Sequence, residues 1–475
     1  MSTTPELPSL DASASHDPHQ TSHDEVAQAT SNPVFTGPIL KTFFYYVVPS
    51  IIGLIAITTA NLVDGAVVGN VIGPDALAAI SLLIPYFTLL FGIALMLAIG
   101  GSVSAGKYIG EDNQQAASSV FSKSLIVTGL IALSFAILST FGSHTLFSLL
   151  GAPENLFNTM QSYFEVITWI LILQLVTMVL YYFVRADGHP VLATTALVIG
   201  ATTNIILDIV FVAYLEWGIA GAAYATGISQ VLQLTALSLY FRSKERTLSF
   251  SFIQHNWREI LTSAYNGVSE FINEISAGII IFLLNWLIIS RLEVDGVAAF
   301  SVVNYLIFLS LMLAYGVADA LHLLVSQNYG AQNFSRIRHF LFTAFASVLT
   351  IGLLLVTTLL LAGETIIQGF LDADQKHISS LSEQLILLIW PLFLVNGINI
   401  ILSCYLTAIH KPNPSALIAA SRTLILPALL LLSFYWLFPG WLFLTALPIA
   451  EWLAFLLALT LCYQYRPQVQ ANEQS

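Results

Sequence analysis

The chain has 475 residues, of which 57% are hydrophobic and only 9% are charged. Ordinary soluble domains carry roughly 25% charged residues, so a water-soluble fold of this composition would expose broad apolar faces. The formal net charge of −12 argues against a nucleic-acid binder, which needs basic residues to replace phosphate counterions. Two cysteines alone cannot form a disulfide framework or a metal site, and we expect no cofactor. The composition therefore indicates a protein embedded in a lipid bilayer.

The first 37 residues differ from the rest of the chain. They contain no Lys or Arg, five acidic residues and many Ser, Thr, Pro and His. A signal peptide would have a basic start and an apolar stretch, and this segment has neither. We predict a disordered cytoplasmic tail. Its His16, His19 and His23 could bind a metal, but a solvated tail is the interpretation we favour.

Long apolar runs then follow one another, and each is long enough to cross the hydrocarbon core, which takes about 20 helical residues. None shows the period-two alternation of a β-barrel strand, so the prediction is an all-α polytopic membrane protein. The twelve predicted spans are 40–64, 77–101, 118–141, 161–184, 191–215, 217–240, 262–288, 298–326, 337–361, 383–409, 415–437 and 440–463.

The basic residues predict the orientation. Ten of the fifteen lie in or beside the loops after even-numbered spans, and Lys41 and Arg466 flank the two termini. Only Arg291 and Lys376 occupy odd-numbered loops, and Arg422 lies within the eleventh span. Because cytoplasmic loops are enriched in Lys and Arg, the even loops and both termini are predicted to face the cytoplasm. An even number of spans also requires the termini to share a side.

An internal repeat divides the chain into two parallel, pseudo-symmetric sets of six helices. The halves align at one constant offset in residue number, which pairs Asp75 with Asp295, Gly110 with Gly330 and Asn113 with Asn333 among other matches. Two such lobes with a site between them suit alternating access. The predicted parts are a tail over 1–37, an amino-terminal lobe over 38–240, a cytoplasmic linker over 241–261, a carboxy-terminal lobe over 262–464 and a cytoplasmic tail over 465–475.

Four polar residues in the amino-terminal lobe are candidates for an ion-coupling site. A charged side chain at mid-membrane costs about 2.5–3.5 kcal/mol on insertion scales, so such residues are functional candidates by default. Asp64 lies near the outer end of the first span, fifteen residues after Pro49, a predicted hinge. Asn204 and Asp208 share one face of the fifth span at similar depth, and Thr226 could add a hydroxyl. Such a hard-oxygen cluster could hold Na⁺ or carry a proton; the alternative is that these groups only cross-link helices.

The carboxy-terminal lobe has a second, less symmetric set of candidates. Glu270 and Glu274 lie one turn apart in the seventh span, and Asp319 and His322 lie three residues apart in the eighth. These residues could bind a cationic substrate or take part in proton transfer. A structural pair satisfied by a neighbouring Asn or by Arg422 is an equally open interpretation.

Motifs for soluble catalytic sites are absent or misplaced. The segment from Gly101 to Tyr108 nearly matches a phosphate-binding loop, but Tyr108 stands where the magnesium-binding Ser or Thr belongs, and the segment ends a membrane helix. The sequence contains no His-Glu-x-x-His pattern and no Gly-x-Ser-x-Gly elbow. We therefore predict that the chain is not an enzyme and that it does not use ATP itself.

Taken in order, the polar segments within and beside the spans resemble those of the multidrug and toxic compound extrusion (MATE) family, and in particular of its MepA-like branch, over residues 38–464. The segments that carry the resemblance are 61–69 with Asp64, 185–188 before Pro190, 204–208, 221–226, 267–274 and 326–331. The resemblance implies two six-helix lobes and export of organic cations driven by inward Na⁺ or H⁺. It also maps the family's amino-lobe ion site onto Asp64, Asn204, Asp208 and Thr226.

Two departures from the family pattern concern the carboxy-terminal lobe. Asn396 and Asn399 stand in the tenth span where some members carry an acid, which argues against an ion site there. His322 and Leu323 stand where a Gln-Pro pair is common, which puts the usual bend of the eighth helix in doubt.

The sequence thus predicts a monomeric, cation-coupled antiporter of the plasma or inner membrane that exports organic cations and drugs. A flippase for a lipid-linked precursor is the main alternative, but it would favour a cationic cleft, whereas the ionisable residues in the spans are mostly acidic. An intramembrane enzyme is a third possibility, for which no convergent catalytic set is found.

Overall fold

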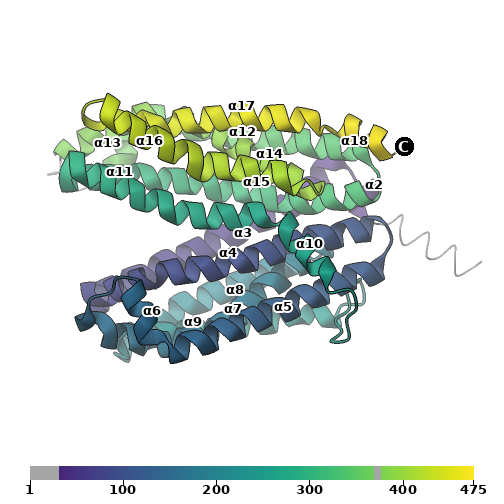
Figure 1. The fold of residues 1–475 in the computed structure, drawn as a ribbon, viewed down its shortest axis with the longest axis horizontal. Helices are drawn as coiled ribbons and strands as arrows, with labels where there is room; N and C mark the ends of the chain where they lie inside the picture. Colours follow the sequence, from purple (N-terminus) through teal and green to yellow (C-terminus); the bar gives the residue numbers. More distant parts are fainter. Residues whose placement is uncertain (1–31, 369–375, 475) are drawn as a thin grey trace, which may run out of the picture.

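The computed structural model describes residues 32–368 and 376–474, and this part of the chain consists of helices and connecting segments without a β-strand. The helices form two bundles, the amino-terminal and carboxy-terminal lobes (Figure 1). Residues 1–31 of the predicted tail, with its three histidines, lie outside the described residues. Asn32 accepts a hydrogen bond from the Val34 amide and caps the short helix α2, so the segment just before the first span is helical.

The amino-terminal lobe consists of α3 to α9. Its long helices are α3 (Ile39–Val67), α4 (Pro74–Gly110), α5 (Gln114–Phe141), α7 (Phe157–Ala186), α8 (Pro190–Asp208) and α9 (Gly218–Ser238). The shorter helical segments are α2 (Pro33–Thr36), α6 (Ser143–Leu149), the π-helices η1 (Val68–Ile72) and η3 (Ile209–Tyr214), and the 3₁₀-helices η2 (Glu154–Leu156) and η4 (Leu239–Arg242).

The carboxy-terminal lobe follows the short helix α10 (Arg258–Asn266). Its helices are α11 (Val268–Gly330), α12 (Phe334–Gln368), α13 (Lys376–Ile389), α14 (Leu392–Ala408), α15 (Pro412–Ala420), the π-helix η5 (Ser421–Ile425), α16 (Leu426–Leu437), the 3₁₀-helix η6 (Gly440–Thr445), α17 (Ala446–Gln464) and α18 (Pro467–Gln474). The predicted terminal tail therefore includes a helix, α18.

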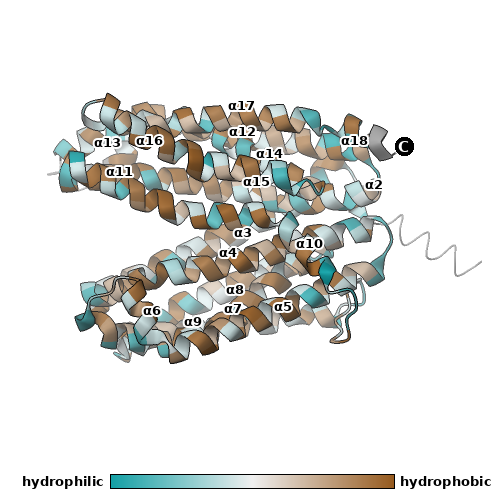
Figure 2. Ribbon diagram, viewed as in Figure 1, coloured by the Kyte–Doolittle hydropathy of each residue, from teal (hydrophilic) through white to brown (hydrophobic). Residues whose placement is uncertain are grey.

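Helix lengths agree with the predicted spans. Nine helices among the described residues are long and apolar enough to cross a membrane, and α13 with α14, bent by 51°, makes a tenth span. The 63-residue α11 holds two spans, because Glu293 interrupts it with φ 58° and ψ −157°. The 21-residue α9 is long enough but more polar, and counting it gives the twelve predicted spans. Figure 2 shows apolar residues along the helices and hydrophilic residues gathered toward their ends.

The repeat is confirmed by the backbone. Gly73 and Glu293 lie 220 positions apart, both have positive φ, and each separates two spans. Asp112 and Gln332, at the same offset, have φ of 58° and 56° in the turns after α4 and α11. A positive φ is uncommon at a residue other than glycine, so the match in two separate turns reflects one duplicated structure. After α7 the offset becomes 222: Ala186 and Ala408 end α7 and α14, and Gly218 and Gly440 have matching φ of 61° and 58°.

The lobes touch most closely at the end of the molecule where α2 and α18 lie, which we call the α2 end (Figure 1). There α4 packs against the second helix of α11. A Cβ atom added at Gly110 would clash with the Gln327 carbonyl oxygen, and one added at Gly330 would clash with the Lys107 carbonyl oxygen. The two glycines and the two carbonyl positions are related by the offset of the repeat, so this is one backbone contact made twice about the pseudo-two-fold axis. Only glycine lets the two helices approach so closely.

The inter-lobe linker was predicted to end at residue 261, but the structure starts α10 at Arg258, and α10 precedes α11 as a separate helix. The reason is an anchor on the amino-terminal lobe that periodicity does not show. Lys123 of α5, only 1% exposed, forms an ion pair with Glu259 of α10 at 2.6 Å, and the Tyr108 hydroxyl donates to the other oxygen of Glu259 at 2.9 Å. These contacts hold α10, and with it the linker, against the amino-terminal lobe.

This ion pair predicts a stability difference. Glu259→Ala should lower the free energy of unfolding by about 3–5 kcal/mol, because it leaves the Lys123 ammonium buried without its counter-charge. The matched control is Glu111→Ala, which breaks the Lys107–Glu111 pair, whose side chains are 36% and 37% exposed. That exposed pair should contribute less than about 1 kcal/mol. Thermal unfolding in detergent measures both variants, and equal losses would contradict a structural role for the Lys123–Glu259 pair.

Candidate functional site

Two carboxylates lie in the half of the amino-terminal lobe that is farther from the α2 end. Asp64 lies near the end of α3, and Asp208 is the last residue of α8 and fully buried. The two carboxylates lie close enough to interact electrostatically with each other and with Tyr163 of α7. Both oxygens of Asp208 and Oδ1 of Asp64 are buried without a hydrogen-bond partner among the described residues. Buried carboxylate oxygens are normally satisfied by hydrogen bonds, so the unpartnered oxygens of this pair are an exception.

The helices that carry these aspartates change their winding beside them. The α-helix α3 becomes the π-helix η1 four residues after Asp64, and α8 becomes the π-helix η3 directly after Asp208. The two π-helices pack against each other and against α9. Such segments are rare and occur frequently at functional sites. Their coincidence with the two aspartates makes this region the candidate site of the amino-terminal lobe.

The other two predicted members of this cluster lie nearby without a direct bond. Asn204 is half-buried one turn before Asp208 on α8, and Thr226 is half-buried on α9, which packs against α8. Among the described residues no hydrogen bond joins either side chain to a carboxylate. The structure thus brings Asp64 and Asp208 together and leaves Asn204 and Thr226 within the same helix group. No set of three or more His, Cys, Asp or Glu that could hold a metal occurs in the described part of the chain.

The duplicated half lacks this site. The residue 220 positions after Asp64 is Leu284, which is buried in an apolar cluster, and the residue 222 positions after Asp208 is Leu430. Asn396 donates to Ser310 at 3.0 Å, and Asn399 donates to Glu451 at 2.7 Å. The amide nitrogens of both side chains are therefore already hydrogen-bonded within the carboxy-terminal lobe. The pair of unpartnered aspartates is therefore specific to the amino-terminal lobe.

The candidates in the carboxy-terminal lobe separate into a paired and an unpaired set. Asp319 forms an ion pair at 3.0 Å with Arg185 of α7, and so links the two lobes. Glu270 accepts from Asn273 at 3.3 Å and lies 4.0 Å from His322, which is too far for a hydrogen bond. Glu274 has no ion-pair partner within the described residues and lies beside Gly92 of α4, across the lobe interface. The helix continues without a break through His322 and Leu323.

Both buried arginines are already paired. Arg422, in the π-helix η5, contacts Glu451 at 3.4 Å and the Tyr315 hydroxyl at 3.3 Å. The sequence analysis used Arg185 to predict orientation and as part of segment 185–188, and its burial was missed because it lies one residue from the end of α7. A basic residue two positions before an Asp-Gly pair gives no signal of a distant acidic partner. The result is that Glu270 and Glu274 face the interface without an arginine or lysine partner.

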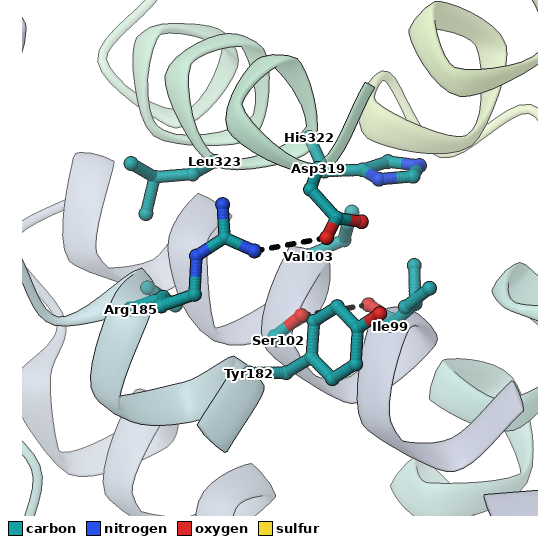
Figure 3. A pocket seen from close by; sticks show the side chains of 9 residues that line it. Ile99, Ser102, Val103, Tyr182, Arg185, Asp319, His322 and Leu323 are labelled. Carbon is teal, nitrogen blue, oxygen red and sulfur yellow. Dashed lines mark hydrogen bonds and ion pairs between the residues drawn. The ribbon is translucent and has the colours of Figure 1, made fainter. Parts of the chain in front are cut away.

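A small cavity lies at the lobe interface beside the Arg185–Asp319 pair (Figure 3). Its volume of about 20 Å³ has room for one water molecule. The lining includes Ser102 of α4, Tyr182 of α7 and His322 of α11. Both ring nitrogens of His322 and Nε of Arg185 are buried without a partner among the described residues. The interface therefore keeps polar groups in a confined space between the lobes.

The chain is similar in sequence to bacterial proteins that are named as multidrug exporters or transporters. The chain is 24% identical over 423 residues to the probable multidrug resistance protein YoeA of Bacillus subtilis, covering 86% of this chain and 87% of YoeA. It is 23% identical over 441 residues to the multidrug export protein MepA of Staphylococcus haemolyticus, with 92% and 96% covered. An FAD transporter of Shewanella oneidensis is 26% identical over 409 residues, with 83% and 87% covered.

Solved structures and a family model agree with this similarity. A crystal structure of MATE in the straight conformation aligns with a TM-score of 0.85 at 23% identity, covering 93% of this chain and 98% of that chain. An outward-facing multidrug resistance MATE family transporter aligns with a TM-score of 0.82 at 23% identity, covering 93% and 98%. The family model MatE matches residues 49–210 and 275–432, which is more than half of the chain. The chain therefore belongs to the MATE family.

Proposed function

We propose that this chain is a secondary active exporter of organic cations and drugs, driven by inward movement of H⁺ or Na⁺ through alternating access. The observation that carries the proposal is the set of unpartnered carboxylate oxygens of Asp64 and Asp208. The relatives named as multidrug exporters support the export of drugs. We further propose a monomer in the plasma membrane, without a cofactor and without enzymatic activity, with both termini and the α2 end in the cytoplasm.

The ion would bind where burial makes charge costly. Asp208 is buried and Asp64 is half-buried, and the two carboxylates repel each other. Oδ1 of Asp64 and both oxygens of Asp208 have no hydrogen bond to offset their desolvation. A proton or a Na⁺ ion would relieve both costs, and Asn204 and Thr226 offer further oxygens on the adjoining helices. To drive transport, the ion must bind more tightly in one conformation than in the other.

The first helix connects this site to the arrangement of the lobes. Before Pro49, α3 buries Phe43, Tyr46 and Val47 in the core cluster of the carboxy-terminal lobe. Beyond α3, Val68 is buried in a cluster of the amino-terminal lobe. Pro49 lacks an amide hydrogen and so weakens the helix between these two parts. Ion binding at Asp64 would change the bend at Pro49 and thereby shift one lobe against the other.

The substrate would be a cation that binds at the lobe interface. Glu270 and Glu274 lie on α11 without an arginine or lysine in an ion pair among the described residues, so their carboxylates would attract a positively charged ligand. Aromatic side chains such as Tyr315 could stack on a planar cation. A lipid pyrophosphate would need free basic groups, and Arg185 and Arg422 are both paired. These charges favour drug export over the flippase alternative.

The ion stoichiometry decides which gradient is used. One elementary charge crossing 100 mV is worth about 2.3 kcal/mol. Exchange of one proton for one monovalent cation moves no net charge, so it would use only the chemical gradient. A second ion, which two carboxylates could accept, would also draw on the membrane potential.

The experiment that tests the proposal is efflux of a fluorescent monovalent organic cation from vesicles containing the purified protein. Na⁺ and pH gradients are imposed separately, in protein-free vesicles as well. We expect one of the two gradients to drive transport and the other to have no effect. FAD serves as an anionic comparison and should not move, because the buried arginines are already paired. Equal dye movement with and without protein under both gradients would overturn the proposal.

A further inference from the structure

We propose that Arg185 is a positioning residue that couples the bend of α3 to closure of the lobes at the α2 end. Its guanidinium donates from Nη2 to the Ser50 hydroxyl at 2.5 Å and from Nη1 to Asp319 at 3.0 Å. The three residues belong to α3, α7 and α11, so one side chain joins the hinge helix to both lobes. The inference rests on the proposed antiport and names the element that would transmit ion binding to the lobe interface.

The two bonds of Arg185 depend on each other. The guanidinium is rigid and planar, so a rotation that breaks one bond misaligns the other. Arg185 and Asp319 are 4% and 7% exposed, so bulk water does not replace a lost contact between them in this conformation. The Tyr181 ring, 5.3 Å away, further restricts the guanidinium. Displacement of Ser50 therefore weakens the bond between Arg185 and Asp319.

Ser50 lies beside the predicted hinge. It follows Pro49, and its hydroxyl donates to the Tyr46 carbonyl oxygen at 2.7 Å while it accepts from Arg185. On the amino-lobe side, Thr194 of α8 donates to the Pro49 carbonyl oxygen at 2.9 Å. On the other side, Gly316 of α11 lies so close to Ile51 that a Cβ atom there would clash. The segment around Pro49 is thus held between the two lobes. Its neighbour Gly316 lies three residues before Asp319 on α11.

Comparison of the two halves separates this contact from ordinary packing. The residue 220 positions after Ser50 is Glu270, the residue 222 positions after Arg185 is Thr407, and the residue 220 positions before Asp319 is Ile99. In the carboxy-terminal lobe the neighbouring contact is a neutral hydroxyl pair, Ser269 with Thr407 at 3.1 Å. The charged three-way contact therefore uses Ser50 and Arg185 of the lobe with the unpartnered aspartates, and the positions equivalent to these two do not form such a contact. Its cavity, with an unpartnered Nε of Arg185, leaves the guanidinium space to reorient (Figure 3).

The test measures opening at the lobe interface directly. Ser102 lines the cavity and is buried, so a cysteine placed there should react with a membrane-impermeant maleimide only when the α2 end opens. The reporter is Ser102→Cys with Cys404→Ala and Cys462→Ala, in vesicles that expose the α2 end. We expect Ser50→Ala to raise the initial labelling rate about 5-fold, an effect that corresponds to roughly 1 kcal/mol. Arg185→Lys should match it, because an ammonium cannot make both bonds in this geometry.

A second arm distinguishes coupling from loss of stability. Combining Ser50→Ala with Asp319→Asn should raise labelling no further than either change alone, since both act through Arg185. Asp64→Asn should change the labelling rate when Ser50 is present and leave it unchanged in the Ser50→Ala background. Thr177→Val is the matched control, because Thr177 is equally buried on α7 and bonds only within its own helix. Its labelling rate should equal that of the reporter.

The outcomes are distinguishable from those of the proposed function. Additive effects of Ser50→Ala and Asp319→Asn, or a response to Asp64→Asn that survives Ser50→Ala, would overturn the role of Arg185 while leaving antiport intact. If Asp64→Asn changes neither labelling nor gradient-driven efflux, the proposed ion site fails.

Discussion

Asp208→Asn is expected to reduce gradient-driven efflux at least about 100-fold, the factor that corresponds to roughly 2.7 kcal/mol of lost ion binding. Asparagine keeps the size of the side chain but cannot be protonated at neutral pH or give a cation a full negative charge. Asp208 is fully buried and both of its oxygens lack partners, so its charge serves no contact in the described structure. The free energy of unfolding should therefore stay the same or rise, because an uncompensated buried charge is removed.

The measurement combines efflux from vesicles with thermal unfolding in detergent. Asp75→Asn is the control: Asp75 lies exposed in the first turn of α4, and its replacement should leave efflux unchanged. Asp64→Asn should behave like Asp208→Asn, since the two carboxylates act on each other. Efflux by Asp208→Asn that remains above half of the wild-type rate would show that ion coupling uses other groups.

Gly110→Ala is expected to lower efflux about 10-fold and to open the α2 end, since overpacking costs typically 1–3 kcal/mol and here penalises the closed state. The added methyl group would clash with the Gln327 carbonyl oxygen, which is backbone and cannot move aside. Gly330→Ala should have the same effect through the Lys107 carbonyl oxygen, because the two contacts are related by pseudo-symmetry. The conformation that is open at the α2 end would become more populated, as an increased labelling rate of Ser102→Cys would show.

The matched control for these substitutions is Gly278→Ala. Gly278 also lies in α11, but a Cβ atom there meets nothing within 4 Å. Replacing glycine by alanine in an uncrowded helix should be neutral or slightly stabilising. If all three variants export equally well, the backbone contact at Gly110 and Gly330 does not limit the conformational change.

The spans, the repeat and the residues inside the membrane were predictable from the sequence for one physical reason. In lipid each backbone amide must bond within its own helix, so apolar length alone defines the elements. The constant offset between the halves likewise became matching turns at Gly73 and Glu293, because a duplicated turn keeps its backbone geometry. The proximity of Asp64 and Asp208 was also predictable, since their positions along the first and fifth spans place both carboxylates at a similar depth in the membrane.

Which acids are paired was decided only by the tertiary structure. Asp319 and Glu451 are held by Arg185 and Arg422, respectively, whereas Asp64, Asp208 and Glu274 have no cationic partner among the described residues. Arg185 and Asp319 are 134 positions apart in the chain and meet only because α7 and α11 face each other across the lobe interface. Helical periodicity records depth and face within one helix, but carries no information about which side chain of a distant helix will stand opposite.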